Sequence, residues 1–121
     1  MQDNPNIFDL SFSDLPWESW IDKVDDNIVE NGFVEYLGAR HFAAFIENKP
    51  TLLVTFESYD QVNALSADGQ PMGWSLAKAL GWSNMALVSD GDTWFRDPRV
   101  FGFFDRLIDD GFFEKFEQIL F

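Results

Sequence analysis

The sequence predicts a single α/β domain with a small parallel or mixed sheet of two or three strands, flanked by helices and preceded by an N-terminal amphipathic helix. Two near-continuous apolar runs, Thr51–Ser58 and Asn84–Asp92, are typical of strands buried on both faces. A helical pattern follows each run, and this strand–helix–strand–helix order favours a right-handed parallel unit. The apolar run Ile119–Phe121 comes where the alternation calls for a third strand.

The chain before the first of these strands carries one clear helical pattern. Residues 1–12 are expected to be a loose N-terminal segment of the single domain, which spans residues 1–121. Ser13 resembles a helix N-cap, and apolar residues recur after it at helical spacing. We expect a short amphipathic turn at Phe33–Leu37. The segment His41–Glu47 fits either a short strand or a helical turn.

Proline, glycine and aspartate mark the helix boundaries in the second half of the chain. Pro71 is expected to open a helix that runs to Leu80 and is stopped by Gly81. Asp97 is a predicted N-cap, with Pro98 as the first helical residue after it. A second short helix, rich in phenylalanine, is expected before the final apolar run.

The composition excludes several classes of protein. A chain of 121 residues with 46% hydrophobic and 17% aromatic residues can bury one core, which excludes a disordered chain. It contains no cysteine, which excludes disulfides, thiolate metal sites and cysteine nucleophiles. Neither a secretory signal nor an apolar run of membrane-spanning length is recognisable. A cytoplasmic protein that does not contact membranes is therefore expected.

The acidity of the chain restricts its partners. Twenty-one acidic residues against eight basic ones give a formal net charge of −13. Charge repulsion disfavours direct binding to nucleic acid or to anionic lipid. Two interpretations stay open: the acidic surface keeps an aromatic-rich domain soluble, or it imitates nucleic-acid phosphates and occupies the basic groove of a protein partner.

Acidic side chains follow both predicted core strands where each strand ends. Glu57 lies at the end of the first strand, and Asp90 and Asp92 lie at the end of the second. Because ligands gather at the carboxyl ends of parallel strands, these acids could hold a hard cation such as Mg²⁺ or Ca²⁺. The same residue types are also ordinary loop and cap residues. Both interpretations stay open, and no cofactor is predicted.

The sequence predicts no catalytic residue. His41 is the single histidine, it precedes the first core strand, and no Gly-x-Ser-x-Gly turn is present to activate a serine. Neither a Gly-x-Gly-x-x-Gly nor a phosphate-loop motif occurs, so nucleotide binding has no support. An enzymatic function is therefore not favoured.

Aromatic and basic residues after the second strand favour a partner-binding patch. The patch consists of Trp94, Phe95, Arg96 and Arg99. Its arginines either pair with the neighbouring acids or dock a partner, since arginine and tryptophan are enriched in interface hot spots. The phenylalanine-rich tail either completes the core or leaves an association surface. The predicted partner contacts in that tail are Phe112, Phe113 and Phe116.

Four phrases of the chain resemble one protein family. They are Leu52–Glu57, Gly81–Ser83, Ser89–Asp97 and Phe104–Phe113. On these phrases almost the whole chain resembles the N-terminal portion of alphaproteobacterial proteins often labelled phosphoadenosine phosphosulfate reductase, with an α/β-hydrolase-like fold. The resemblance implies that Thr51–Glu57 and Met85–Asp90 are neighbouring core strands. It also implies that the loop after Glu57 matches the region that supplies an oxyanion-hole donor in hydrolases.

The same resemblance implies no catalytic residue in this sequence. In longer relatives the strand that starts at Ile119 would continue into a glycine-rich turn that carries the nucleophile, and those positions are not part of this chain. The reductase chemistry of the family label depends on cysteine, which this chain lacks. The expectation is therefore a truncated relative of a larger α/β protein.

Three functional hypotheses result. The leading one is a non-catalytic acidic domain that binds a protein partner. The second is a nucleic-acid-mimicking inhibitor of a nuclease or defence complex, of the phage anti-CRISPR type. The third is a hydrolase-like enzyme that uses the acids at the strand tips. Because a half-finished sheet exposes an edge that proteins pair or cover, a homodimer or a heterocomplex is expected.

Overall fold

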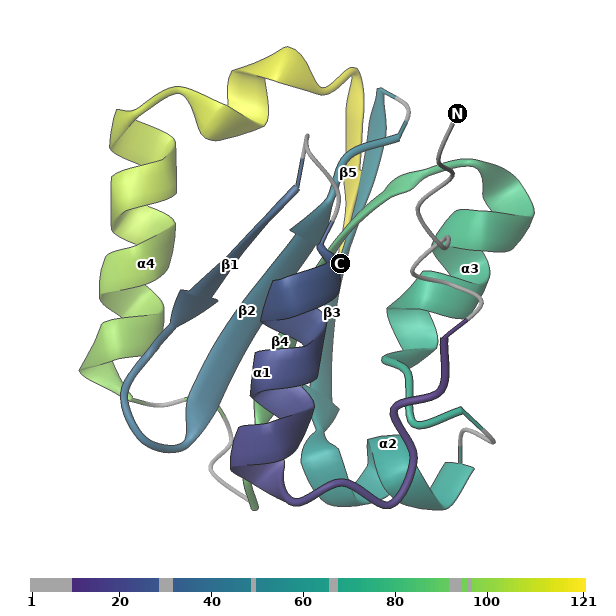
Figure 1. Ribbon diagram of the computed structural model, residues 1–121. Helices are drawn as coiled ribbons and strands as arrows, with labels where there is room; N and C mark the ends of the chain where they lie inside the picture. Colours follow the sequence, from purple (N-terminus) through teal and green to yellow (C-terminus); the bar gives the residue numbers. More distant parts are fainter. Residues whose placement is uncertain (1–9, 29–31, 49, 66–67, 92–94, 96) are drawn as a thin grey trace.

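A computed structural model of the chain describes residues 10–28, 32–48, 50–65, 68–91, 95 and 97–121 (Figure 1). Along this part of the chain, an N-terminal helix is followed by three strands and then by alternating helices and strands. The elements are α1 (Trp17–Asn27), β1 (Phe33–Tyr36), β2 (His41–Ile46), β3 (Thr51–Ser58), α2 (Tyr59–Leu65), α3 (Met72–Leu80), β4 (Ser83–Ser89), α4 (Pro98–Asp109), the short 3₁₀ helix η2 (Phe112–Lys115) and β5 (Gln118–Leu120).

The strands form one mixed sheet in the order β1-β2-β4-β3-β5. β2 is antiparallel to both β1 and β4, whereas β3 is parallel to both β4 and β5. The expected α/β class with flanking helices is confirmed. The expected number of two or three strands is wrong, because the described chain forms a five-stranded sheet.

The strands missing from the expectation are β1 and β2, which add an antiparallel hairpin to the parallel part of the sheet. The segment expected as a turn forms β1, and the ambiguous segment after it forms β2. Both give a weak strand signal for physical reasons. β1 has only four residues, and β2 is a short apolar run that periodicity alone does not distinguish from a buried helical turn.

The two parallel connections leave the sheet on opposite faces. α2 and α3 join β3 to β4 on the face that also carries α1, whereas α4 and η2 join β4 to β5 on the other face (Figure 1). The domain therefore has three layers, with one core on each side of the sheet. We call the two sides the α1 face and the α4 face.

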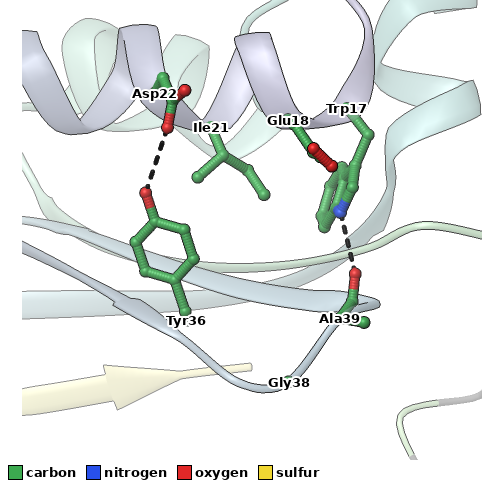
Figure 2. Close-up of a pocket in the computed structure, with 7 residues that line it drawn as sticks. All are labelled: Trp17, Glu18, Ile21, Asp22, Tyr36, Gly38 and Ala39. Atoms are coloured by element: carbon green, nitrogen blue, oxygen red, sulfur yellow. Dashed lines mark hydrogen bonds between the residues drawn. The ribbon is translucent and has the colours of Figure 1, made fainter.

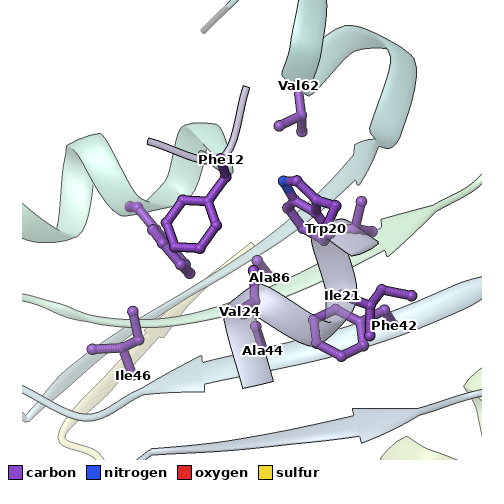
Figure 3. Close-up of a cluster of buried hydrophobic side chains, with 11 residues drawn as sticks. Phe12, Trp20, Ile21, Val24, Phe42, Ala44, Ile46, Val62 and Ala86 are labelled. Carbon is purple, nitrogen blue, oxygen red and sulfur yellow. The ribbon is translucent and has the colours of Figure 1, made fainter. Parts of the chain in front are cut away.

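The core of the α1 face is built around two fully buried tryptophans, Trp20 and Trp74. Figure 3 shows Trp20 and Phe12 within this cluster. The Trp20 Nε1 atom donates a hydrogen bond to the Gly69 carbonyl oxygen at 2.7 Å, which links α1 to the loop before α3. Phe12 belongs to the segment expected to be loose, yet it is fully buried, and its N–H donates to the Asp68 carbonyl oxygen at 2.6 Å.

Helix α1 begins at Trp17, four residues later than the predicted N-cap Ser13. Asp14 has a left-handed φ of 62°, which prevents a helix from starting there. Pro16 precedes the helix, and a proline disfavours helical conformation in the residue before it. The expected amphipathic helix is therefore present but shorter.

The helix boundaries predicted in the second half of the chain are confirmed. α3 follows Pro71 and ends at Gly81, whose φ of 71° suits glycine best. α4 begins at Pro98, and the Asp97 side chain accepts a hydrogen bond from the Arg99 N–H at 2.8 Å. Residues at the helix ends therefore define the bounds of α3 and the start of α4, the two crossover helices that connect parallel strands.

Candidate functional site

Glu57, a predicted ligand residue, is bound by helix α3. Its carboxylate accepts hydrogen bonds from the backbone N–H groups of Met72 and Gly73, and from the Thr55 hydroxyl at 2.9 Å. Pro71 supplies no side-chain cap to this helix, so Glu57 satisfies its first N–H groups and complements the positive end of its dipole. Glu57 therefore holds α3 against β3.

Asp90 lies beside Arg40 at the end of β4. The Asp90 N–H donates to the Arg40 carbonyl oxygen at 2.8 Å, and Arg40 Nε donates to the Asp90 carbonyl oxygen at 2.9 Å. Asp92 lies outside the described residues. Within the described part of the chain, no group of three or more histidine, aspartate or glutamate side chains is placed to hold a metal ion. The three-acid ligand site stays a prediction.

The predicted aromatic and basic patch is described only in part. Trp94 and Arg96 lie outside the described residues. Phe95 has a φ of 55°, which is uncommon for an aromatic residue, and its ring centroid lies 5.7 Å from that of His41 and 5.2 Å from that of Phe56. Phe95 therefore packs at the carboxyl end of the parallel strands.

Arg99 lies on the first turn of α4 with its side chain largely exposed. Its guanidinium is 3.5 Å from the Asp97 carboxylate, which is the self-pairing considered from the sequence. The aliphatic part of Arg99 passes over Gly38, where a Cβ atom would lie 2.8 Å from the Arg99 Cδ. A role of Arg99 in partner binding stays a prediction.

Phe112, Phe113 and Phe116 are half-buried and pack against the core of the α4 face. The Lys115 ammonium lies 4.8 Å from the Phe112 ring centroid and 5.5 Å from the Phe116 centroid. The same ammonium is 3.1 Å from the Glu47 carboxylate. The three rings therefore pack against the core, Phe112 and Phe116 also make a cation–π contact with Lys115, and partner binding by the three stays a prediction.

His41 is buried, with 3% of its surface exposed, at the start of β2. Burial lowers the pKa of the imidazole, and the charge of Asp97 opposes this shift. Its partner across the strand pair is Ser89, whose hydroxyl donates to the Gly91 carbonyl oxygen at 2.9 Å. Burial therefore favours a neutral histidine that is enclosed by the fold.

A hollow of about 350 Å³ opens between α1 and the β1–β2 hairpin (Figure 2). α1 supplies one wall, β1 supplies the opposite wall, and the turn between β1 and β2 closes one end. The lining residues are Trp17, Glu18, Ile21, Asp22, Tyr36, Gly38 and Ala39. Gly38 permits this turn, because its φ of 85° is strained for other residues.

The two aromatic walls of the hollow are held by contacts with the rest of the fold. The Trp17 Nε1 atom donates to the Ala39 carbonyl oxygen at 3.1 Å, and its ring stacks on Trp20 at an interplanar angle of 8°. The Tyr36 ring packs edge-on against Phe42, with centroids 5.5 Å apart. Both rings are therefore positioned before any ligand arrives.

Negative charge collects along α1 at the rim of the hollow. The helix carries Glu18, Asp22, Asp25 and Asp26 against a single base, Lys23. The Lys23 ammonium is directed away to the chain before α1, where it donates to a backbone carbonyl oxygen at 2.6 Å. The carboxylates at the rim are therefore not neutralised by the basic residue of their own helix.

Partial burial and this negative charge act together on the phenol of Tyr36. Its hydroxyl donates to Asp22 Oδ1 at 3.5 Å, at the long end of hydrogen-bond distances (Figure 2). Partial burial, followed by the charges of Asp25, Asp22 and Asp26, raises the pKa of Tyr36 above its ordinary value. The negative potential that opposes ionisation of the phenol attracts cations to the same place.

The hollow therefore combines the features that bind a positively charged side chain. Aromatic faces attract lysine and arginine through their ring quadrupoles, and carboxylates form charge-assisted hydrogen bonds with them. Trp17 and Tyr36 supply the faces, and Glu18 and Asp22 supply the carboxylates.

The sequence alone does not single out this hollow. The helical pattern assigns Trp17 and Ile21 to the buried stripe of α1, and the expected turn at Phe33–Leu37 does not predict on which face Tyr36 lies. Had this segment been predicted as a strand, its alternation would have placed Tyr36 on the same face as Val34, which packs against the α1-face core.

No protein-family model matches the chain, and neither a curated protein nor a solved structure matches it. The family resemblance of the four sequence phrases therefore stays a prediction. Among the helices of the described residues, none is long and apolar enough to cross a membrane.

Proposed function

We propose that this acidic domain binds a basic segment of a protein partner, with a lysine or arginine side chain in the hollow between α1 and the β1–β2 hairpin. The observation that supports this proposal is the union of two aromatic walls, Trp17 and Tyr36, with two carboxylates, Glu18 and Asp22, in one hollow.

The charge of the chain supports the same proposal at longer range. A net charge of −13 attracts a basic partner and raises its association rate. Because Trp17 and Tyr36 are already held by contacts within the fold, binding costs little further ordering of these two side chains. The long-range electrostatic field of the chain thus raises the association rate, and the hollow determines where the cationic side chain binds.

The test is an Asp22→Asn substitution in the full chain. The wild-type protein first captures its partner from a native lysate, and the partner's affinity for each variant is then measured by calorimetry. We expect Asp22→Asn to weaken binding by about 1 kcal/mol, or about fivefold. Tyr36→Ala is expected to weaken it by a similar amount, because one aromatic wall is lost.

Asp105→Asn is the matched control, because it makes the same change of charge at an exposed position on α4. It should leave the affinity nearly unchanged, whereas high salt should weaken binding of the wild type. Equal losses for Asp22→Asn and Asp105→Asn would contradict the proposal. That result would favour the nucleic-acid mimic, whose binding energy is spread over the whole acidic surface.

A further inference from the structure

The hollow between α1 and the β1–β2 hairpin has two ends that are alike in chemistry. Figure 2 shows Asp22 next to Tyr36 at one end and Glu18 next to Trp17 at the other, with Ile21 between them. Each end therefore combines one carboxylate with one aromatic ring, and an apolar side chain separates the two ends. Because Glu18 and Asp22 are four residues apart on α1, their Cβ atoms lie about 5–6 Å apart on one face of the helix.

The hydrogen-bond donors on the side chains of the hollow are already engaged. Among the described residues that line it, Trp17 and Tyr36 are the two whose side chains carry an N–H or O–H group. The Trp17 Nε1 atom donates to the Ala39 carbonyl oxygen, and the Tyr36 hydroxyl donates to Asp22. The Glu18 and Asp22 carboxylates accept hydrogen bonds. A ligand that suits these side chains must therefore bring several N–H donors of its own.

Two ion pairs elsewhere in the fold show which cations a single carboxylate beside an aromatic ring accommodates. Arg106 pairs with Glu35, and its guanidinium carbon lies 5.8 Å from a phenylalanine ring centroid. Lys115 pairs with Glu47, and its ammonium lies 4.8 Å from another such centroid. One carboxylate with an aromatic ring therefore takes either cation. The hollow differs from both of these sites because it presents two carboxylates.

Two carboxylates one helical turn apart favour a guanidinium over an ammonium. The three donors of an ammonium radiate from one nitrogen, whereas a guanidinium carries five N–H donors on three nitrogens in one plane. Different N–H groups of one guanidinium can therefore reach Glu18 and Asp22 together while its plane lies against an aromatic ring. The hollow is open to solvent, since Tyr36 is 52% exposed, and the weaker hydration of a guanidinium further favours its entry.

We propose that the hollow selects arginine over lysine, and that Glu18 determines this selectivity. The selectivity rests on the proposed function, because it narrows the basic segment of the partner to one that presents an arginine. Asp22 and Tyr36 bind either cation at their end of the hollow. Glu18 supplies the second carboxylate, which a guanidinium held at that end reaches with its remaining N–H groups and an ammonium does not.

The experiment titrates the full chain with three short peptides that differ in one residue. Each peptide is acetyl-Ser-Gly-Xaa-Gly-Ser-amide, in which the central residue is arginine, lysine or citrulline, an uncharged analogue of arginine. Nuclear magnetic resonance follows the Trp17 Nε1–H group and the Tyr36 backbone N–H group, because both residues line the hollow. We expect the arginine peptide to bind about fivefold more tightly than the lysine peptide, and the citrulline peptide to bind more weakly than either.

Glu18→Gln tests the residue that is proposed to determine selectivity, and Asp25→Asn is its control. Both substitutions remove one negative charge from an exposed position on α1, but only Glu18 lines the hollow. Glu18→Gln should lower the affinity of the arginine peptide to that of the lysine peptide. Asp25→Asn should preserve the difference between the two peptides, and circular dichroism checks that both variants are folded.

The possible outcomes separate this selectivity from the proposed function. Equal affinities of the arginine and lysine peptides for the wild type would overturn the selectivity and leave the proposed function standing. A preference for arginine that survives Glu18→Gln would overturn the role of Glu18. If neither basic peptide shifts the Trp17 or Tyr36 resonances, the hollow does not bind a cationic side chain, and both proposals are wrong.

Discussion

On the α1 face of the sheet Trp20 is fully buried and tied to a loop by a hydrogen bond, whereas on the α4 face the phenylalanines of η2 and its C-terminal end are only half-covered. Trp20 on the α1 face is completely buried and donates to the Gly69 carbonyl oxygen. Phe112 and Phe116 on the α4 face are partly exposed and are flanked by Lys115. The two cores thus use aromatic residues in different ways.

The two cores therefore differ in what their aromatic side chains determine. Those of the α1 face fix the positions of neighbouring elements, whereas those of the α4 face mainly bury apolar area. A tryptophan with a bonded Nε1 atom fits one orientation, which fixes α1 and, through its stacking on Trp17, one wall of the hollow. Phenylalanine has no polar atom, so the α4 face packs without such directional contacts. The hollow lies on the face where Trp17 and Trp20 are fixed by hydrogen bonds to backbone carbonyl oxygens.

The largest expected effect is on stability when Trp20 is truncated. Trp20→Ala should lower the free energy of unfolding by about 3–5 kcal/mol, because it leaves a cavity in a closed core. Phe112→Ala should cost about 1–2 kcal/mol, because part of that ring already contacts solvent. Urea unfolding followed by far-UV circular dichroism measures both values.

Trp20→Phe separates packing from hydrogen bonding in the same experiment. It keeps most of the apolar volume but leaves the Gly69 carbonyl oxygen without this donor, so a loss of about 1–3 kcal/mol is expected. If Phe112→Ala destabilises the protein as much as Trp20→Ala, the proposed difference between the two faces is wrong.

A smaller effect is expected at the caps of the two crossover helices. Glu57→Ala removes the acceptor for the first N–H groups of α3, which should cost about 1–2 kcal/mol. Asp97→Ala removes the local cap of α4 and should cost about 1 kcal/mol. Hydrogen exchange gives the sharper measurement: Glu57→Ala should increase exchange in α3 and spare α4, and Asp97→Ala should do the reverse. Equal changes in both helices would show that neither carboxylate acts as a cap.

The smallest effect concerns His41, a buried histidine on the α4 face. Burial lowers its pKa in the folded protein, so the unfolded chain binds the proton more readily. Its contribution to stability is complete above the unfolded pKa of about 6.5 and is lost as the pH falls through the folded pKa.

The measurement compares urea unfolding of the wild type and His41→Gln at neutral pH and at mildly acidic pH. The wild type should lose more stability on acidification than the variant, because only the wild type has a histidine at position 41 that is protonated more readily in the unfolded chain. The contributions of the carboxylates are common to both proteins and cancel in the comparison. An identical pH dependence in the two proteins would show that His41 is protonated as easily in the folded state as in the unfolded chain.

Local sequence patterns predict much of the part of the fold that contains the parallel strands, but they do not predict the candidate site. The sequence predicted β3 with its observed bounds, and it predicted the boundaries of α3 and the start of α4. It predicted Glu57 at a strand tip but not its partner, because the N–H group of Gly73 that it binds is sixteen residues away. The hollow was missed because its two walls come from α1 and β1, and β1 is too short to show a strand pattern.

The sequence by itself determined the α/β class, the helices flanking the sheet and the acidic character, since apolar runs, prolines, glycines and charges act within a few residues. The tertiary structure decided the five-stranded sheet, the binding of Glu57 by the N–H groups of α3 and the hollow beside α1. Each of these depends on contacts between distant segments, such as Trp17 with Ala39 and Trp20 with Gly69. Such contacts form only when the helices pack on the complete sheet, so they cannot be predicted from local sequence patterns.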